Sequence, residues 1–237
     1  MPNEILHKTT MSMQALGMHH NPDPHGNPPK EFVVSYMRLR QSIGWIGFLM
    51  PVCVRLLAYV TQNVHWTDSI SAYYYTAARD ELVGPLVLVG VQLCSYRTPA
   101  KQDNILALVA GISGICVALF PMSQQKACGL LGSLPACQPP PGQGPVVHMY
   151  FAIVFFVVIS YMVLFRFKKT WSGTLMKRKI IRNRVYMTMG STMAASFVLI
   201  GYFDLTGNET SIFWPETMGV MAFAAAWRVK GQVILRG

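Results

Sequence analysis

Long apolar runs separated by short polar segments are the main pattern along this chain. Each run holds about 16 to 22 residues, close to the roughly 20 that an α-helix needs to cross about 30 Å of hydrocarbon. The pattern therefore predicts an all-α integral membrane bundle of six transmembrane helices. The expected spans cover about residues 42–60, 80–96, 104–121, 147–166, 185–203 and 212–230.

The composition agrees with a membrane protein. Hydrophobic residues make up 52% of the chain and charged residues 13%, about half the charged fraction of an average soluble domain. Residues 1–30 differ, because they are polar, contain several prolines and lack the apolar core of a secretory signal. We expect a flexible cytoplasmic tail over residues 1–30 and a six-span membrane domain over residues 31–237.

The net charge of +10 raises the question of nucleic-acid binding, which its distribution answers. More than half of the Lys and Arg residues fall in the run from Arg166 to Arg184 and in the tail after Trp227. With both termini in the cytoplasm, the outer loops contain only Arg79 and Lys126 as basic residues. Basic clusters beside spans then act as cytoplasmic anchors, and no nucleic-acid partner is expected.

Two features inside the spans predict helix contacts. The third span begins near Asp103, an expected N-cap, and carries Ala110, Gly114 and Ala118 on one stripe, which allows another helix to approach closely. The first span contains Arg55, which costs on the order of 2.5–3.5 kcal/mol at mid-span unless it reaches the interface or a carboxylate. We expect Arg55 to pair with Asp80 or Glu81.

The second outer loop contains two cysteines, Cys128 and Cys137, among several Pro and Gly residues. On the oxidising side of a membrane this arrangement predicts a disulfide bond. Two free thiols, or half of a metal site, remain the alternatives.

The densest group of chemically capable side chains lies between the first two spans, from His65 to Glu81. The predicted topology brings this segment and the start of the fourth span to the outer face. The residues that we expect to bind a ligand there are His65, Asp68, Ser69, Ser71, Tyr73, Arg79, Asp80 and His148. Trp66 and the tyrosines at 73–75 are also typical of a membrane interface, whatever the function.

Three short patterns resemble a family of uncharacterised multi-span bacterial inner-membrane proteins. They are Ser-Ile-Ser-Ala-Tyr-Tyr-Tyr-Thr at 69–76 followed by Arg79-Asp80, Leu-Phe-Pro at 119–121, and Val147-His148. The resemblance covers about residues 38–203. It implies a polytopic helical protein of the bacterial inner membrane (plasma membrane) with this helix order, and it supplies no catalytic residues.

Three function classes fit the outer face. The first is a non-enzymatic binding or accessory subunit, with an aromatic cap for a lipid, a small ligand, or a partner chain such as another membrane subunit or a second copy. The second is a lipid hydrolase with zinc held by His65, His148 and either Asp80 or Asp204. The third is a small-solute transporter or channel, since six spans divide into two groups of three.

The binding or accessory class is preferred on the residues alone. The chain contains no phosphate-binding glycine loop, nucleophile elbow or H-E-x-x-H motif. No cofactor is expected, and internal similarity between the two halves is not evident.

Overall fold

The computed structural model describes residues 30–122, 144–168, 176–207 and 212–231. The chain divides into two compact units, residues 1–38 and 39–237, and each is considered by itself. Only residues 30–38 of the first unit are described, and they form the start of a helix. The rest of the predicted tail, together with Cys128 and Cys137, lies outside the described residues, so the disulfide stays a prediction.

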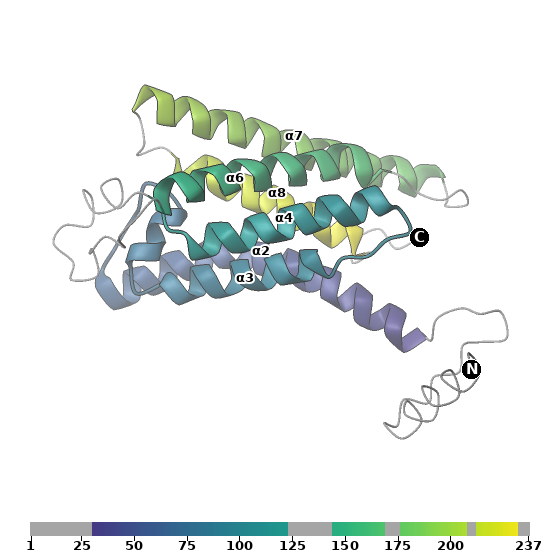
Figure 1. Ribbon diagram of the computed structural model, residues 1–237, viewed down its shortest axis with the longest axis horizontal. Helices are drawn as coiled ribbons and strands as arrows, with labels where there is room; N and C mark the ends of the chain where they lie inside the picture. The colour runs from purple at the N-terminus through teal and green to yellow at the C-terminus, as the bar shows by residue number, and fades with distance from the viewer. Residues whose placement is uncertain (1–29, 123–143, 169–175, 208–211, 232–237) are drawn as a thin grey trace, which may run out of the picture. The chain divides into compact units, whose positions relative to one another are not determined.

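The predicted all-α class is confirmed in the described residues, where all regular secondary structure is helical (Figure 1). A short 3₁₀ helix, η1, precedes the second long helix, and a π-helical turn, η2, ends the fourth. The elements are α2 (Lys30–Gln62), η1 (Ser71–Tyr75), α3 (Arg79–Cys94), α4 (Lys101–Leu119), α6 (Gly144–Tyr161), η2 (Met162–Arg166), α7 (Met176–Thr206) and α8 (Phe213–Lys230).

Four helical segments of the described chain are long and apolar enough to cross a membrane. They are Met37–Gln62, Lys101–Leu119, Val146–Arg166 and Ile180–Thr206. The other two predicted spans form helices but differ for physical reasons. With 16 residues, α3 is only about 24 Å long, and α8 carries acidic Glu216 together with basic Arg228 and Lys230.

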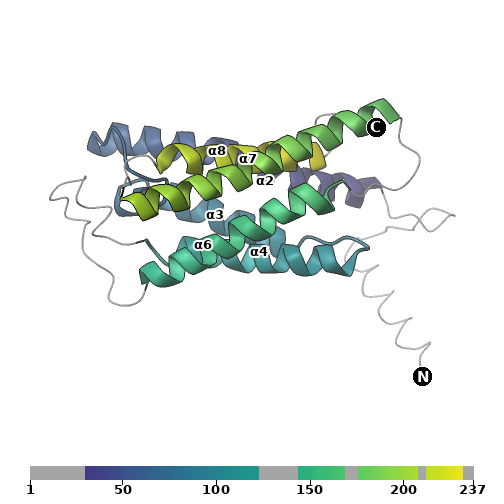
Figure 2. The same cartoon turned by 90° about the horizontal axis from the view of Figure 1, so that it is seen from above.

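The long helices of the second unit lie side by side and roughly antiparallel (Figures 1 and 2). Neighbouring helices pack in the order α3, α4, α6, α7 and α8. The last helix, α8, packs closely against the first, α2. A β-carbon added at Gly47 of α2 would lie only 2.9 Å from the β-carbon of Ala224 in α8. A hydrogen bond from Gln92 of α3 to Ser42 of α2 completes the ring of contacts.

The small-residue stripe of α4 packs as predicted. Ala107, Ala110, Gly114 and Ala118 are buried, and a β-carbon added at Gly111 would lie 2.6 Å from the carbonyl oxygen of Gly90 in α3. The two helices thus touch backbone to backbone, which only glycine permits.

The prediction that Asp103 caps α4 is wrong. Ala100 occupies the N-cap position, and Asp103 forms an ion pair with Arg166 of η2. Both side chains are largely buried, at 16% and 8% exposure. A buried arginine needs a carboxylate more than the helix needs a cap, since an unpaired buried charge costs several kcal/mol and a lost cap about 1 kcal/mol.

Candidate functional site

The segment between α2 and α3, residues 63–78, is called here the cap segment, and the end of the bundle that it covers is the cap end (Figure 1). Its direction is set where α2 ends. Asn63 adopts a left-handed conformation with φ of 56°, and the N–H of Val64 then donates to the carbonyl of Ala58 at 3.2 Å. This arrangement is a common helix ending that favours Gly or Asn. The chain turns back beside α2, which brings His65 and Trp66 next to that helix.

Several hydroxyl groups of the cap segment hold this segment in place. Thr67 donates to the carbonyl of Ser69 at 2.7 Å, and the Ser69 hydroxyl accepts from the N–H of Ala72 at 3.1 Å. Tyr75 donates to the carbonyl of Met122, beyond the end of α4, at 2.7 Å. Burial raises the pKa of the Tyr73 and Tyr75 phenols, because the interior disfavours the phenolate. Ser69 and Tyr73, predicted ligand contacts, are buried at 3% and 0% exposure and are interior parts of the cap.

A carboxylate and an aromatic cluster join the cap segment to the start of α8. Glu216 accepts a hydrogen bond from the N–H of Ile70 at 2.5 Å. The Trp66 ring meets those of Phe213 and Trp214 with ring centroids 5.4 Å apart in each case. These contacts fix Trp66 between two helices that are far apart in sequence.

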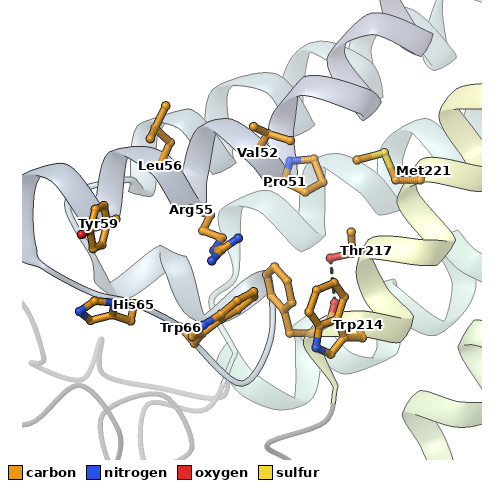
Figure 3. A pocket seen from close by; sticks show the side chains of 11 residues that line it. Pro51, Val52, Arg55, Leu56, Tyr59, His65, Trp66, Trp214, Thr217 and Met221 are labelled. Carbon is orange, nitrogen blue, oxygen red and sulfur yellow. Dashed lines mark hydrogen bonds between the residues drawn. The ribbon is translucent and has the colours of Figure 1, made fainter.

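A groove of about 500 Å³ lies between α2 and α8, with Trp66 at the end toward the cap segment (Figure 3). Its volume falls within the roughly 300–1,000 Å³ typical of small-molecule sites. The residues that line it are mainly apolar and aromatic: Pro51, Val52, Arg55, Leu56, Tyr59, His65, Trp66, Phe213, Trp214, Thr217 and Met221. Its rim is exposed, with Val52 at 56% and Trp214 at 58%, so the groove opens on the side of the bundle.

Arg55 supplies the charge of this groove. Its guanidinium carbon lies over the Trp66 ring, 3.6 Å from the centroid (Figure 3). The expected ion pair with Asp80 or Glu81 is not formed among the described residues. The reason is geometric: Arg55 shares a face of α2 with Val52 and Tyr59, and that face looks toward α8, whereas both carboxylates belong to the first turn of α3.

His65 is the only one of the eight predicted ligand-binding residues among those that line the groove. It contacts the Tyr59 ring edge-on, with ring centroids 5.1 Å apart. Ser71 and His148 instead line a second cavity of about 20 Å³, room for no more than a water molecule or so. The His148 Nδ1 lies 2.7 Å from the carbonyl oxygen of Phe120 and therefore carries the proton that it donates.

The charged residues predicted for the site lie outside both cavities. Arg79 donates to the hydroxyl of Tyr74 at 2.7 Å and stacks over that ring. Asp80 is exposed in the first turn of α3, and Asp68 belongs to the cap segment without lining the groove. The structure thus gathers the eight predicted residues at one end of the bundle but does not join them in a single site.

The residues predicted to hold zinc are likewise not brought together. His65 and His148 line different cavities, and neither Asp80 nor Asp204 lines either of them. Within the described residues, no three His, Cys, Asp or Glu side chains lie close enough together to hold one metal ion.

Sequence reasoning missed the α8 wall of the groove, formed by Trp214, Thr217 and Met221. It also treated Arg55 only as a charge that requires a partner. One signal was available: Val52, Arg55 and Tyr59 follow the three- and four-residue spacing of a single helix face. The wall that faces them comes from a helix about 160 residues later, and no local pattern gives that pairing.

Comparison of the chain with protein-family models, with curated proteins and with solved structures yields no match. The resemblance to bacterial inner-membrane proteins therefore stays a prediction, and the groove is interpreted from its own geometry.

Proposed function

We propose that this protein is a non-enzymatic membrane binding protein that holds the acyl chain of a membrane lipid in the groove between α2 and α8. The observation that carries the proposal is the groove itself: a cavity of about 500 Å³ with mainly apolar walls, open on the side of the bundle and lined by Trp66 toward the cap segment. Acyl chains are the apolar ligands available at the side of a membrane helix.

The proposal includes six crossings of a bacterial inner membrane, with both termini cytoplasmic and the cap end outside. Four segments have the length and hydropathy of a span, and α3 and α8 lie alongside them in the same antiparallel bundle. The cap segment contains no Lys or Arg and is followed by Arg79, whereas the opposite end contains Arg97, Lys101 and Lys230. This asymmetry supports a cytoplasmic position for the end opposite the cap.

The first test blocks the groove by adding bulk at its rim. Val52 is 56% exposed and lines the groove, so Val52→Trp places an indole where the acyl chain would lie without disturbing the core. The protein is reconstituted with a diacyl lipid that carries a photoactivatable acyl chain, and the labelled peptides are identified by mass spectrometry. We expect labels on groove residues of α2 and α8 in the native protein and their loss in Val52→Trp.

The matched control is Val60→Trp, the same change on the same helix. Val60 is 70% exposed and lies outside the groove, so groove labelling should be unchanged. Labelling spread evenly over all lipid-facing helices, and equally insensitive to both variants, would reject the proposal.

A further inference from the structure

The groove carries one cation whose role acyl-chain binding does not explain. Arg55 is exposed, yet its neighbours along the α2 face are the apolar residues Val52, Leu56 and Tyr59. A charge at such a place is costly unless it reaches water or an anion. Within the described part of the chain, no carboxylate or hydrogen-bond acceptor binds the Arg55 guanidinium, which stacks on the face of Trp66.

Stacking on Trp66 prepares the guanidinium for a ligand. An indole beneath the guanidinium plane covers one face and fixes that plane, while the N–H groups along its edge still point outward. This planar set of donors matches two oxygens of a phosphate group in a bidentate contact. Trp66 is itself held by Phe213 and Trp214, so little side-chain entropy remains to be lost on binding.

The depth of Arg55 fits the phosphate of a diacyl lipid whose chain fills the groove. Arg55 lies two turns before the end of α2 at Gln62, about 10 Å along the helix axis. Apolar groove residues such as Pro51 and Met221 lie on the side away from the cap, and His65 and Trp66 lie on the side toward it (Figure 3). A lipid bound with its acyl chain against Met221 and its phosphate beside Arg55 matches the apolar end and the charged end of the groove.

We propose that Arg55, stacked on Trp66, binds the phosphate of a membrane phospholipid whose acyl chain occupies the α2–α8 groove. This inference rests on the proposed lipid-binding function and adds to it the class of headgroup. The neighbouring His65 imidazole lines the same mouth of the groove and provides a second nitrogen near the bound phosphate.

The experiment compares probes that share a photoactivatable acyl chain and differ in headgroup. Full-length protein in dodecyl maltoside, a detergent without phosphate, is labelled with probe forms of phosphatidylglycerol, diacylglycerol and free fatty acid. We expect groove labelling by phosphatidylglycerol to exceed labelling by diacylglycerol on the order of tenfold, the ratio that a charge-assisted hydrogen bond provides. The fatty-acid probe should also label weakly, and inorganic phosphate added in excess should not displace phosphatidylglycerol.

Two substitutions assign the preference to Arg55. Arg55→Leu should reduce phosphatidylglycerol labelling to the diacylglycerol level, and Arg55→Lys, which keeps the charge without the planar donors, should restore only part of it. Arg79→Leu is the matched control, because Arg79 is also exposed at the cap end and stacked on an aromatic ring, but lies outside the groove. It should retain the full preference.

The outcomes separate the headgroup from the function. Equal groove labelling by phosphatidylglycerol and diacylglycerol, or loss of the preference in Arg79→Leu, overturns the phosphate inference and leaves acyl-chain binding intact. Strong labelling by the fatty acid, or displacement by inorganic phosphate, also overturns it. Absence of groove labelling by every probe rejects the proposed function itself. If Arg55→Leu does not fold, the phosphate inference is tested by the headgroup comparison in the native protein and by the Arg55→Lys variant.

Discussion

Two arginines illustrate how burial decides what a charged side chain does in this protein. Arg166 is 8% exposed and is paired with Asp103 inside the bundle. Arg55 is exposed on the side of α2, and an aromatic ring rather than a carboxylate is its partner among the described residues. A buried charge must be neutralised within the fold, whereas an exposed charge at a membrane surface is available to a ligand.

The Asp103–Arg166 pair should contribute strongly to stability. Asp103→Ala leaves the Arg166 guanidinium buried without its partner, and we expect the free energy of unfolding to fall by about 3–5 kcal/mol. The measurement is an unfolding titration of the detergent-solubilised protein. Asp80→Ala is the control, since Asp80 also lies in the first turn of a helix but is exposed, and its loss should cost less than about 1 kcal/mol.

The double variant Asp103→Leu/Arg166→Met tests whether the unpaired Arg166 charge causes the loss of stability in Asp103→Ala. Replacing both charges by apolar side chains removes the unpaired cation, so the double variant should be more stable than Asp103→Ala. A double variant that is no better would mean that the loss comes from packing rather than from the unpaired charge.

At the scale of helices, close approach depends on which small residues face each other. Gly111 of α4 meets Gly90 of α3, so their backbones touch. The spacing of Ala and Gly in α4 was enough to predict a close contact, but it did not name the partner helix. In the cap segment, sequence patterns suggested a function that the packing does not support. Ser69 and Tyr73 look like ligand-binding groups in sequence, but a hydrogen bond from Ser69 to Met122 and a ring contact between Tyr73 and Phe213 hold them in the interior.

Substitution at the α3–α4 contact should separate the two helices. A β-carbon at Gly111 would lie 2.5 Å from Cys94 Sγ and 2.6 Å from the Gly90 carbonyl oxygen. Because backbone atoms cannot move aside as a side chain can, Gly111→Ala should lower the free energy of unfolding by about 1–3 kcal/mol.

Gly201→Ala is the matched control for Gly111→Ala. Gly201 lies inside α7, and a β-carbon there has nothing within 4 Å, so the change should be neutral or slightly stabilising. Equal losses in the two variants would show that the α3–α4 contact tolerates added volume.

At the scale of the whole molecule, the proposed function requires a defined orientation in the membrane. The groove opens near the cap end, so the leaflet that supplies its lipid depends on which side the cap segment faces. In the proposed topology, which the distribution of Lys and Arg supports, the cap end lies outside and the outer leaflet supplies the lipid.

Cysteine labelling in cells tests this orientation. In a background with the five native cysteines replaced, Ala77→Cys introduces a thiol at an exposed position of the cap segment, and Ser95→Cys introduces one at the exposed opposite end of α3. A membrane-impermeant maleimide should label Ala77→Cys in intact cells and Ser95→Cys only after permeabilisation. Labelling in the reverse order would invert the proposed topology.

The sequence by itself determined the helices and which faces of them are apolar, because hydropathy and the helical repeat are local properties. It predicted helices at all six expected spans, the close packing of α4, and the gathering of polar residues at one end. Only the tertiary structure decided that Glu216 and Met122 hold the cap segment, and that α2 and α8 form a groove around Arg55. The physical reason is that a repeat gives a helix its faces, whereas the partner of each face depends on contacts between residues far apart in the chain.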